Sequence, residues 1–182
     1  KNEFIMPDEY KKFVHSEDDD IIYKVYKKYQ EILYKNNSVD FDDLLILPIK
    51  LFKTYKEVLD YYQEKYKYIL IDEYQDTNYA QYILIKLLSK KYKNLCVVGD
   101  NDQSIYMFRN ADYRNILNFE NDYKDAKVIM LEQNYRSTKT ILNAANSVIK
   151  NNNFRKDKNL WCDNEEGDKI SFYKAYDEID EV

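Results

Sequence analysis

The sequence predicts an α/β protein in which a parallel sheet with flanking helices follows a helical segment. Two apolar stretches, at about 67–72 and 94–100, are typical of buried parallel strands, and each runs directly into acidic residues. The stretch between them carries apolar side chains at helical spacing, which predicts a right-handed parallel crossover. Residues 1–66 show helical spacing too, most clearly over 21–33. Pro48 lies inside this helical region, where we expect a kink or a break.

Composition and charge restrict the class of protein. The chain of 182 residues is 45% apolar and 34% charged, and its net charge is −5. A nucleic acid must therefore be bound by a local patch or by base stacking, because overall charge does not attract a polyanion. His15, Cys96 and Cys162 do not have metal-ligand spacing, and a reduced cytosolic compartment fits the two cysteines. Cys96 lies in a strand pattern, so we expect a small core residue. The sequence has no apolar run near 18 residues, so we expect no membrane span.

The C-terminal third of the chain continues the alternation of helix and strand. A helix at about 112–122 should lead to a third strand at 126–131. Ser137 is placed to act as the N-cap of the amphipathic helix that follows. Residues 151–167 are polar and rich in turn-forming residues, which predicts a connector, and residues 169–176 look like one further strand.

The first predicted strand ends in Asp72 and Glu73, and the second ends in Asp100. Parallel strands bring their C-terminal ends to one edge of the sheet, where ligands of open α/β sheets bind. Mg²⁺ is commonly held by one or two carboxylates together with waters and phosphates, so we assign Asp72 to the metal. Glu73 is then the general base of a nucleotide hydrolysis site, and it is also placed to contact the metal. The alternative for an isolated Ile-Asp-Glu is a solvated acidic turn at a strand end.

A polar loop that turns into aromatic residues and an arginine follows Asp100. In the functional interpretation Gln103 senses a phosphate by hydrogen bonding, Tyr106 and Phe108 stack on a single-stranded base, and Arg109 contacts a phosphate or a ring. The alternative is a loop whose aromatic side chains pack down onto the protein. Composition alone leaves both interpretations open.

Three strings in this chain resemble, in the expected order, motifs II, III and IV of superfamily 1 DNA helicases of the UvrD/PcrA/Rep group. They are Asp-Glu-Tyr-Gln-Asp-Thr-Asn at 72–78, Gly-Asp-Asn-Asp-Gln-Ser-Ile-Tyr-Met-Phe-Arg-Asn-Ala at 99–111 and Leu-Glu-Gln-Asn-Tyr-Arg-Ser-Thr at 131–138. Val-Asp-Phe-Asp-Asp-Leu at 39–44 resembles a segment of the same helicases that precedes motif II.

This resemblance implies a domain organisation. Residues 1–66 correspond to the end of an inserted helical domain and the return to the motor. Residues 67–150 correspond to the second half of the first RecA-like (P-loop NTPase-type) ATPase domain. Residues 151–182 correspond to the connector and the truncated start of the second RecA-like domain.

The resemblance also implies roles for single residues. In the family, the residue at Gln103 couples the γ-phosphate to the DNA site, the tyrosine at Tyr135 stacks on adenine, and the arginine at Arg136 contacts the γ-phosphate. The aromatic residues at Tyr106 and Phe108 hold single-stranded DNA. ATP and Mg²⁺ are the implied cofactors.

The family usually has glycine where this chain has Asn110. Asparagine is the residue, after glycine, that best tolerates a positive φ, so we expect the turn to be retained. How closely a DNA backbone approaches this turn depends on the same position.

The function implied is an ATP-dependent DNA helicase that moves 3′ to 5′ on single-stranded DNA and unwinds duplexes. Its implied partners are single-stranded DNA, duplex junctions and proteins of repair or replication. The implied location is the cytoplasm, and no contact with a membrane is expected. The chain begins at Lys1, and its only glycines, Gly99 and Gly167, do not form a phosphate loop, so we expect an excerpt that is inactive alone. One alternative is a DNA- or protein-binding module on a helicase scaffold. Another is a nuclease, which the sequence favours less because a second acidic cluster with an adjacent lysine is missing.

Overall fold

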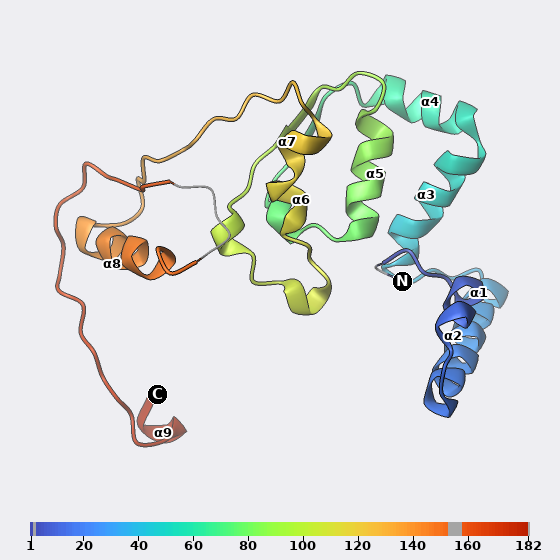
Figure 1. The fold of residues 1–182 in the computed structure, drawn as a ribbon, viewed down its shortest axis with the longest axis horizontal. Helices are drawn as coiled ribbons and strands as arrows, with labels where there is room; N and C mark the ends of the chain where they lie inside the picture. Colours follow the sequence, from blue (N-terminus) through green and yellow to red (C-terminus); the bar gives the residue numbers. More distant parts are fainter. Residues whose placement is uncertain (2, 153–157, 182) are drawn as a thin grey trace. The chain divides into compact units, whose positions relative to one another are not determined.

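The computed structural model describes residues 1, 3–152 and 158–181, and the chain divides into two compact units, Lys1–Asp122 and Tyr123–Val182 (Figure 1). The first unit contains the predicted helical segment and the sheet. The second contains motif IV and the residues that follow it. No helix in the described part of either unit combines the length and the apolar character that crossing a bilayer requires.

Helices occupy residues 1–66 of the first unit, as the sequence predicts. They are α1 (Pro7–Tyr10), α2 (Glu17–Lys35), α3 (Asp43–Thr54) and α4 (Lys56–Lys65), with a short 3-10 helix at Lys11–Phe13. Ser16 begins α2, because its side-chain oxygen accepts a hydrogen bond from the Asp19 backbone N–H. Four acidic residues in the first turn of α2 further stabilise its N-terminus.

Helix α3 continues through Pro48. Of the kink or break expected there, the break is therefore wrong, and the kink stays a prediction. A proline inside a helix removes one backbone hydrogen bond and crowds the preceding turn. The apolar face of the helix compensates for this loss, since Ile46 and Ile49 on either side of Pro48 are both fully buried. Helix α3 packs against α4 and α5, and these helices together enclose most of the core of the first unit (Figure 1).

The sheet of the first unit pairs β1 (Ile69–Ile71) with β2 (Leu95–Val97) in parallel. Helix α5 (Tyr79–Ser89) connects the two strands, which confirms the predicted strand–helix–strand order. Asn78 is the N-cap of α5 and forms a capping box with Gln81.

One face of this sheet is open to solvent. Leu70 and Cys96 are register partners on that face; Leu70 is 76% exposed, and Cys96 is exposed as well. The expectation that Cys96 is a core residue is therefore wrong, because in the described chain α3, α4 and α5 do not cover its side of the sheet. The neighbouring strand residues on the other face are half-buried.

Two other predicted elements differ from the structure. The helix expected at 112–122 is divided at Asn118 into α6 (Arg114–Leu117) and α7 (Phe119–Asp122). The strand expected at 126–131 is wrong: this segment is extended without ladder partners, and its apolar residues are exposed. A strand requires a neighbour for its backbone groups, and among the described residues this segment has none.

The second unit is organised around α8 (Lys139–Ile149), with a short helix α9 (Glu178–Glu181) near its end. Thr138, rather than Ser137, is the N-cap of α8, so the predicted cap is wrong by one residue. Gln133 forms a parallel bridge with Trp161, and the Asn146 side chain donates to the Leu160 carbonyl at 2.9 Å. The strand expected at 169–176 is wrong for the same lack of a partner. Part of the predicted connector, residues 153–157, lies outside the described residues.

Candidate functional site

Strand β1 delivers Asp72 and Glu73 directly past its last residue, at the sheet edge that the sequence predicts. Glu73 has left-handed backbone angles, φ 48° and ψ 45°, which are uncommon for residues other than glycine and cost of order 1–2 kcal/mol. The Asp72 side chain accepts a hydrogen bond from the Glu73 backbone N–H at 2.9 Å. The backbone strain therefore lies at the residue that we assign to the general base.

The end of β2 lies beside this turn. The Val98 backbone N–H donates to the Ile71 carbonyl at 2.8 Å, and the Tyr74 N–H donates to the Val98 carbonyl at 3.0 Å. Asp100 follows two residues later, and its carboxylate accepts the side-chain amide of Gln103 at 2.9 Å. The structure thus brings the ends of β1 and β2 together, as the sequence predicts.

Gln75 connects the two strand ends, and the sequence did not single it out. It lies in the short 3-10 helix η2 (Tyr74–Asp76) and is 1% exposed. Its Nε2 donates to Glu73 Oε2 at 2.7 Å, and its Oε1 accepts from the Asp100 backbone N–H at 3.0 Å. The one feature of the sequence that could have indicated its role is the position of this glutamine among the acidic residues of motif II.

The acids of this edge interact electrostatically. Burial, and then the negative charge of Glu73, raises the pKa of Asp76. The Oδ1 atom of Asp76 is buried without a hydrogen-bond partner, and its Oδ2 atom is 3.4 Å from Gln75 Nε2. The edge therefore carries concentrated negative potential, which favours a cation.

The fit of a Mg²⁺ ion depends on the donors available. Among the described residues, groups of three or more His, Cys, Asp or Glu side chains arranged to hold a metal do not occur. A nucleotide-associated Mg²⁺ does not need such a group, because waters and phosphates complete its coordination. Asp72 is exposed and supplies a hard oxygen donor at the sheet edge, so this residue fits the ion.

The loop after Asp100 presents aromatic side chains to solvent. Phe108 is 76% exposed and Tyr106 is 39% exposed, with their ring centroids 6.0 Å apart. The Arg109 guanidinium lies over both rings, 5.2 Å from the Tyr106 centroid and 5.3 Å from the Phe108 centroid. The alternative in which these aromatics pack down is wrong for Phe108. Asn110 has φ 63°, so it supplies the left-handed turn expected of it.

Tyr135 and Arg136 belong to the second unit. Tyr135 is 80% exposed, and its hydroxyl donates to the Gln133 side chain at 2.7 Å. The Asn134 side chain accepts the backbone N–H groups of Arg136 and Ser137, at 3.0 and 2.8 Å, which fixes the backbone of motif IV. That these two side chains share a nucleotide with Glu73 and Gln103 stays a prediction.

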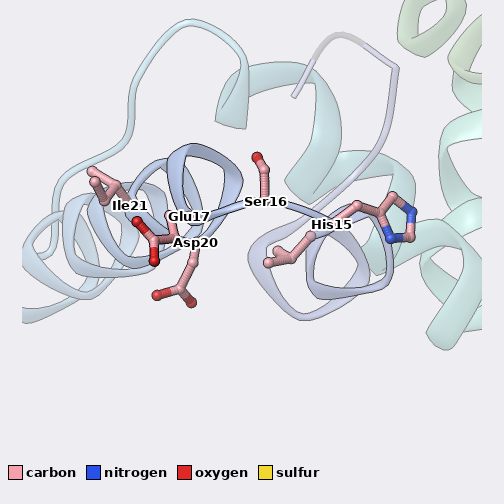
Figure 2. A pocket seen from close by; sticks show the side chains of 6 residues that line it. His15, Ser16, Glu17, Asp20 and Ile21 are labelled. Atoms are coloured by element: carbon pink, nitrogen blue, oxygen red, sulfur yellow. The ribbon is translucent and has the colours of Figure 1, made fainter.

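An open pocket lies at the start of α2, and none of the residues that line it belongs to motifs II, III or IV. It is lined by residues 14–17, 20 and 21, and Figure 2 shows these side chains around the N-terminus of the helix. It contains none of the residues assigned above to catalysis or binding.

Two family models match this chain. Residues 1–124 match the UvrD/REP helicase N-terminal domain, and residues 129–182 match the UvrD-like helicase C-terminal domain. The chain therefore belongs to the UvrD/REP helicase family.

Among its relatives are proteins named ATP-dependent DNA helicase PcrA. The one from Bacillus subtilis (strain 168) is 58% identical over 181 residues, which cover 100% of this chain and 24% of that protein. Those from Staphylococcus epidermidis (strain ATCC 12228 / FDA PCI 1200) and Staphylococcus aureus (strain NCTC 8325 / PS 47) are each 57% identical over 182 residues, 25% of their length. This chain thus spans about a quarter of the length of these relatives.

Proposed function

We propose that this chain is the central part of an ATP-dependent DNA helicase that moves 3′ to 5′ on single-stranded DNA and unwinds duplexes. The observation that carries the proposal is the joining of the two strand ends, with Glu73, Gln75, Asp100 and Gln103 linked by hydrogen bonds. Membership of the UvrD/REP family and the PcrA relatives support the same function.

In the proposed mechanism Glu73 orients a water and accepts its proton as the water attacks the γ-phosphate. Asp72 would hold a Mg²⁺ ion, which would neutralise phosphate charge when bound. Gln103 turns from the Asp100 carboxylate towards the γ-phosphate. Tyr135 stacks on adenine, and the guanidinium of Arg136 stabilises the charge that develops in the transition state.

Single-stranded DNA is held on the exposed aromatic loop. Base–aromatic stacking contributes about 1–3 kcal/mol per base and does not depend on base identity. Tyr106 follows Gln103 by three residues, so a movement of Gln103 towards a phosphate also moves the stacking residues. This short connection is the proposed link between nucleotide state and grip on DNA.

The chain as given lacks a Gly-rich phosphate loop, which favours a second candidate function, a DNA- or protein-binding module without turnover. The two candidates predict different behaviour of the full-length protein. Only a motor hydrolyses ATP faster when single-stranded DNA is added.

The test is DNA-stimulated ATP hydrolysis by the full-length protein and its Glu73→Gln, Arg136→Ala and Phe108→Ala variants. Glu73→Gln should lower kcat about 10²- to 10⁴-fold, because the general base is lost. Arg136→Ala should lower it about 10³- to 10⁵-fold. Phe108→Ala should mainly raise the DNA concentration needed for stimulation, because about 1–3 kcal/mol of stacking is lost.

Glu57→Gln and Arg114→Ala are matched controls, because these exposed residues lie outside the motifs and should leave kcat unchanged. A wild-type protein without DNA-stimulated turnover would favour the binding module. Normal hydrolysis by Glu73→Gln would show that Glu73 is not the base.

A further inference from the structure

We infer that Gln75 is a positioning residue that holds the carboxylate of Glu73 in place for catalysis and ties it to the γ-phosphate sensor Gln103. The inference rests on the proposed function, in which Glu73 is the general base. Gln75 itself touches neither nucleotide nor metal in this proposal. It acts through the two residues that it connects.

The hydrogen bonds of Gln75 fix the orientation of its side-chain amide. A backbone N–H only donates, so the atom facing Asp100 must be the amide oxygen, 3.0 Å away. A carboxylate only accepts, so the atom facing Glu73 Oε2 must be the amide nitrogen, 2.7 Å away. Glutamine satisfies both neighbours at once, whereas glutamate or methionine of similar length does not.

Burial makes these two bonds strong and specific. Gln75 is 1% exposed, so water does not compete for its amide. Among the described residues, Gln75 alone donates a hydrogen bond to the Glu73 carboxylate, and this bond uses Oε2. Oε1 is therefore the atom that we assign to the proton of the attacking water.

The backbone of Glu73 explains why a positioning residue is needed. Residues with left-handed angles are strained, and such strain persists only where the surroundings hold it. Three hydrogen bonds hold Glu73: its backbone N–H donates to the Asp72 side chain, its carbonyl accepts the Asp76 N–H at 2.9 Å, and its carboxylate accepts from Gln75. Removing Gln75 leaves the carboxylate free to rotate, although the two hydrogen bonds of the Glu73 backbone remain.

The same residue reaches the sensor through Asp100. Gln75 Oε1 accepts the Asp100 N–H, and Asp100 Oδ2 accepts the Gln103 side-chain amide at 2.9 Å. The Ser104 hydroxyl adds a 3.5 Å contact to the Gln75 carbonyl. Three hydrogen bonds in series thus connect the base with the sensor, and Gln75 supplies two of them.

The test measures kcat and KM of DNA-stimulated ATP hydrolysis by the full-length protein. Gln75→Met keeps the volume but loses both bonds, and should lower kcat about 10- to 100-fold, part of the roughly 10²–10⁴ that a general base supplies. KM for ATP should stay within about twofold, because Gln75 does not contact ATP. Gln75→Glu keeps the size and the acceptor for the Asp100 N–H but cannot donate to the Glu73 carboxylate, so it should lower kcat by a similar factor with little change in KM.

Gln63→Met is the matched control. Gln63 is 5% exposed, and its side chain donates to the Leu87 carbonyl at 2.7 Å, away from the motifs. This change should lower the Tm but leave kcat and KM unchanged, which separates a structural role from a positioning role.

A wild-type kcat for Gln75→Met or for Gln75→Glu would overturn the inference. A loss of hydrolysis in Glu73→Gln would then still support the proposed function. Normal hydrolysis by Glu73→Gln would instead overturn the proposed function itself. If Gln75→Met does not fold, the kcat and KM of the isosteric Gln75→Glu decide alone.

Discussion

Gly99 lies next to the Gln75 side chain, and replacing it by alanine tests how closely the two strand ends fit. A Cβ atom at position 99 would lie 2.5 Å from Gln75 Oε1, 2.9 Å from Ile116 Cδ1 and 3.1 Å from the Tyr74 backbone N. Non-bonded carbon contacts are normally about 3.5–4.0 Å. The Gln75 amide oxygen must therefore retreat by roughly 1 Å, which breaks its bond to the Asp100 N–H.

The expected loss of stability combines two terms. Overpacking a well-filled site costs about 1–3 kcal/mol, and leaving a buried donor without an acceptor costs about 1–3 kcal/mol. We expect Gly99→Ala to lose about 2–4 kcal/mol in total, because the end of a glutamine side chain moves more easily than backbone does. For a domain of this size that corresponds to about 5–15 °C in Tm, measured by scanning calorimetry of the full-length protein at a fixed scan rate.

A double-mutant cycle identifies the source of the loss. In a Gln75→Ala background the largest clash is absent, so Gly99→Ala should cost about 0.5–3 kcal/mol less than it does alone. In a Gln63→Ala background the two effects should add within about 0.5 kcal/mol, because Gln63 shares no partner with Gly99 in the recorded contacts. Additive effects of Gly99→Ala and Gln75→Ala would refute the reasoning.

Two further predictions concern the turn at Asn110 and the phenol of Tyr26. Because Asn110 has φ 63°, Asn110→Ala should lower the free energy of unfolding by about 1 kcal/mol, whereas Asn110→Gly should not lower it. Equal Tm values for the two variants would contradict this prediction. Burial, and then the charge of Asp43, raises the pKa of Tyr26 to about 12. The Tyr26 phenol therefore loses its proton at a lower pH in the unfolded chain than in the folded one, so the free energy of unfolding should fall between about pH 10 and 12. The fall should be smaller in Tyr26→Phe. Urea titrations of both proteins at pH 9 and 11 measure it.

The position of Asp72 and Glu73 at a strand end was predictable because its signal is local. An apolar run ending in Asp72 and Glu73 fixes both the strand and the end at which the acids lie. Asn110 was predictable in the same way, since one residue type identifies a positive φ. Both inferences depend on chemistry contained in a few consecutive residues.

Pairing and burial were less predictable, because they depend on residues distant in sequence. The pattern at 126–131 predicts a strand but does not show which strand it would pair with, and among the described residues it has no ladder partner. Cys96 lies in a true strand, yet its exposure depends on which side of the sheet the helices cover. Gln75 was missed because an uncharged amide has no distinctive pattern, and only its buried contacts reveal its role.

The open face of the sheet has a practical consequence for handling the chain. Tyr68, Leu70 and Val98 are 76%, 76% and 48% exposed around Cys96, and within the described residues β1 and β2 are both edge strands. Water wets such a surface poorly, and unpaired edges invite strand addition from other molecules. Sulfate and phosphate strengthen apolar association, so precipitation by these salts should begin at this face before the rest of the surface is affected.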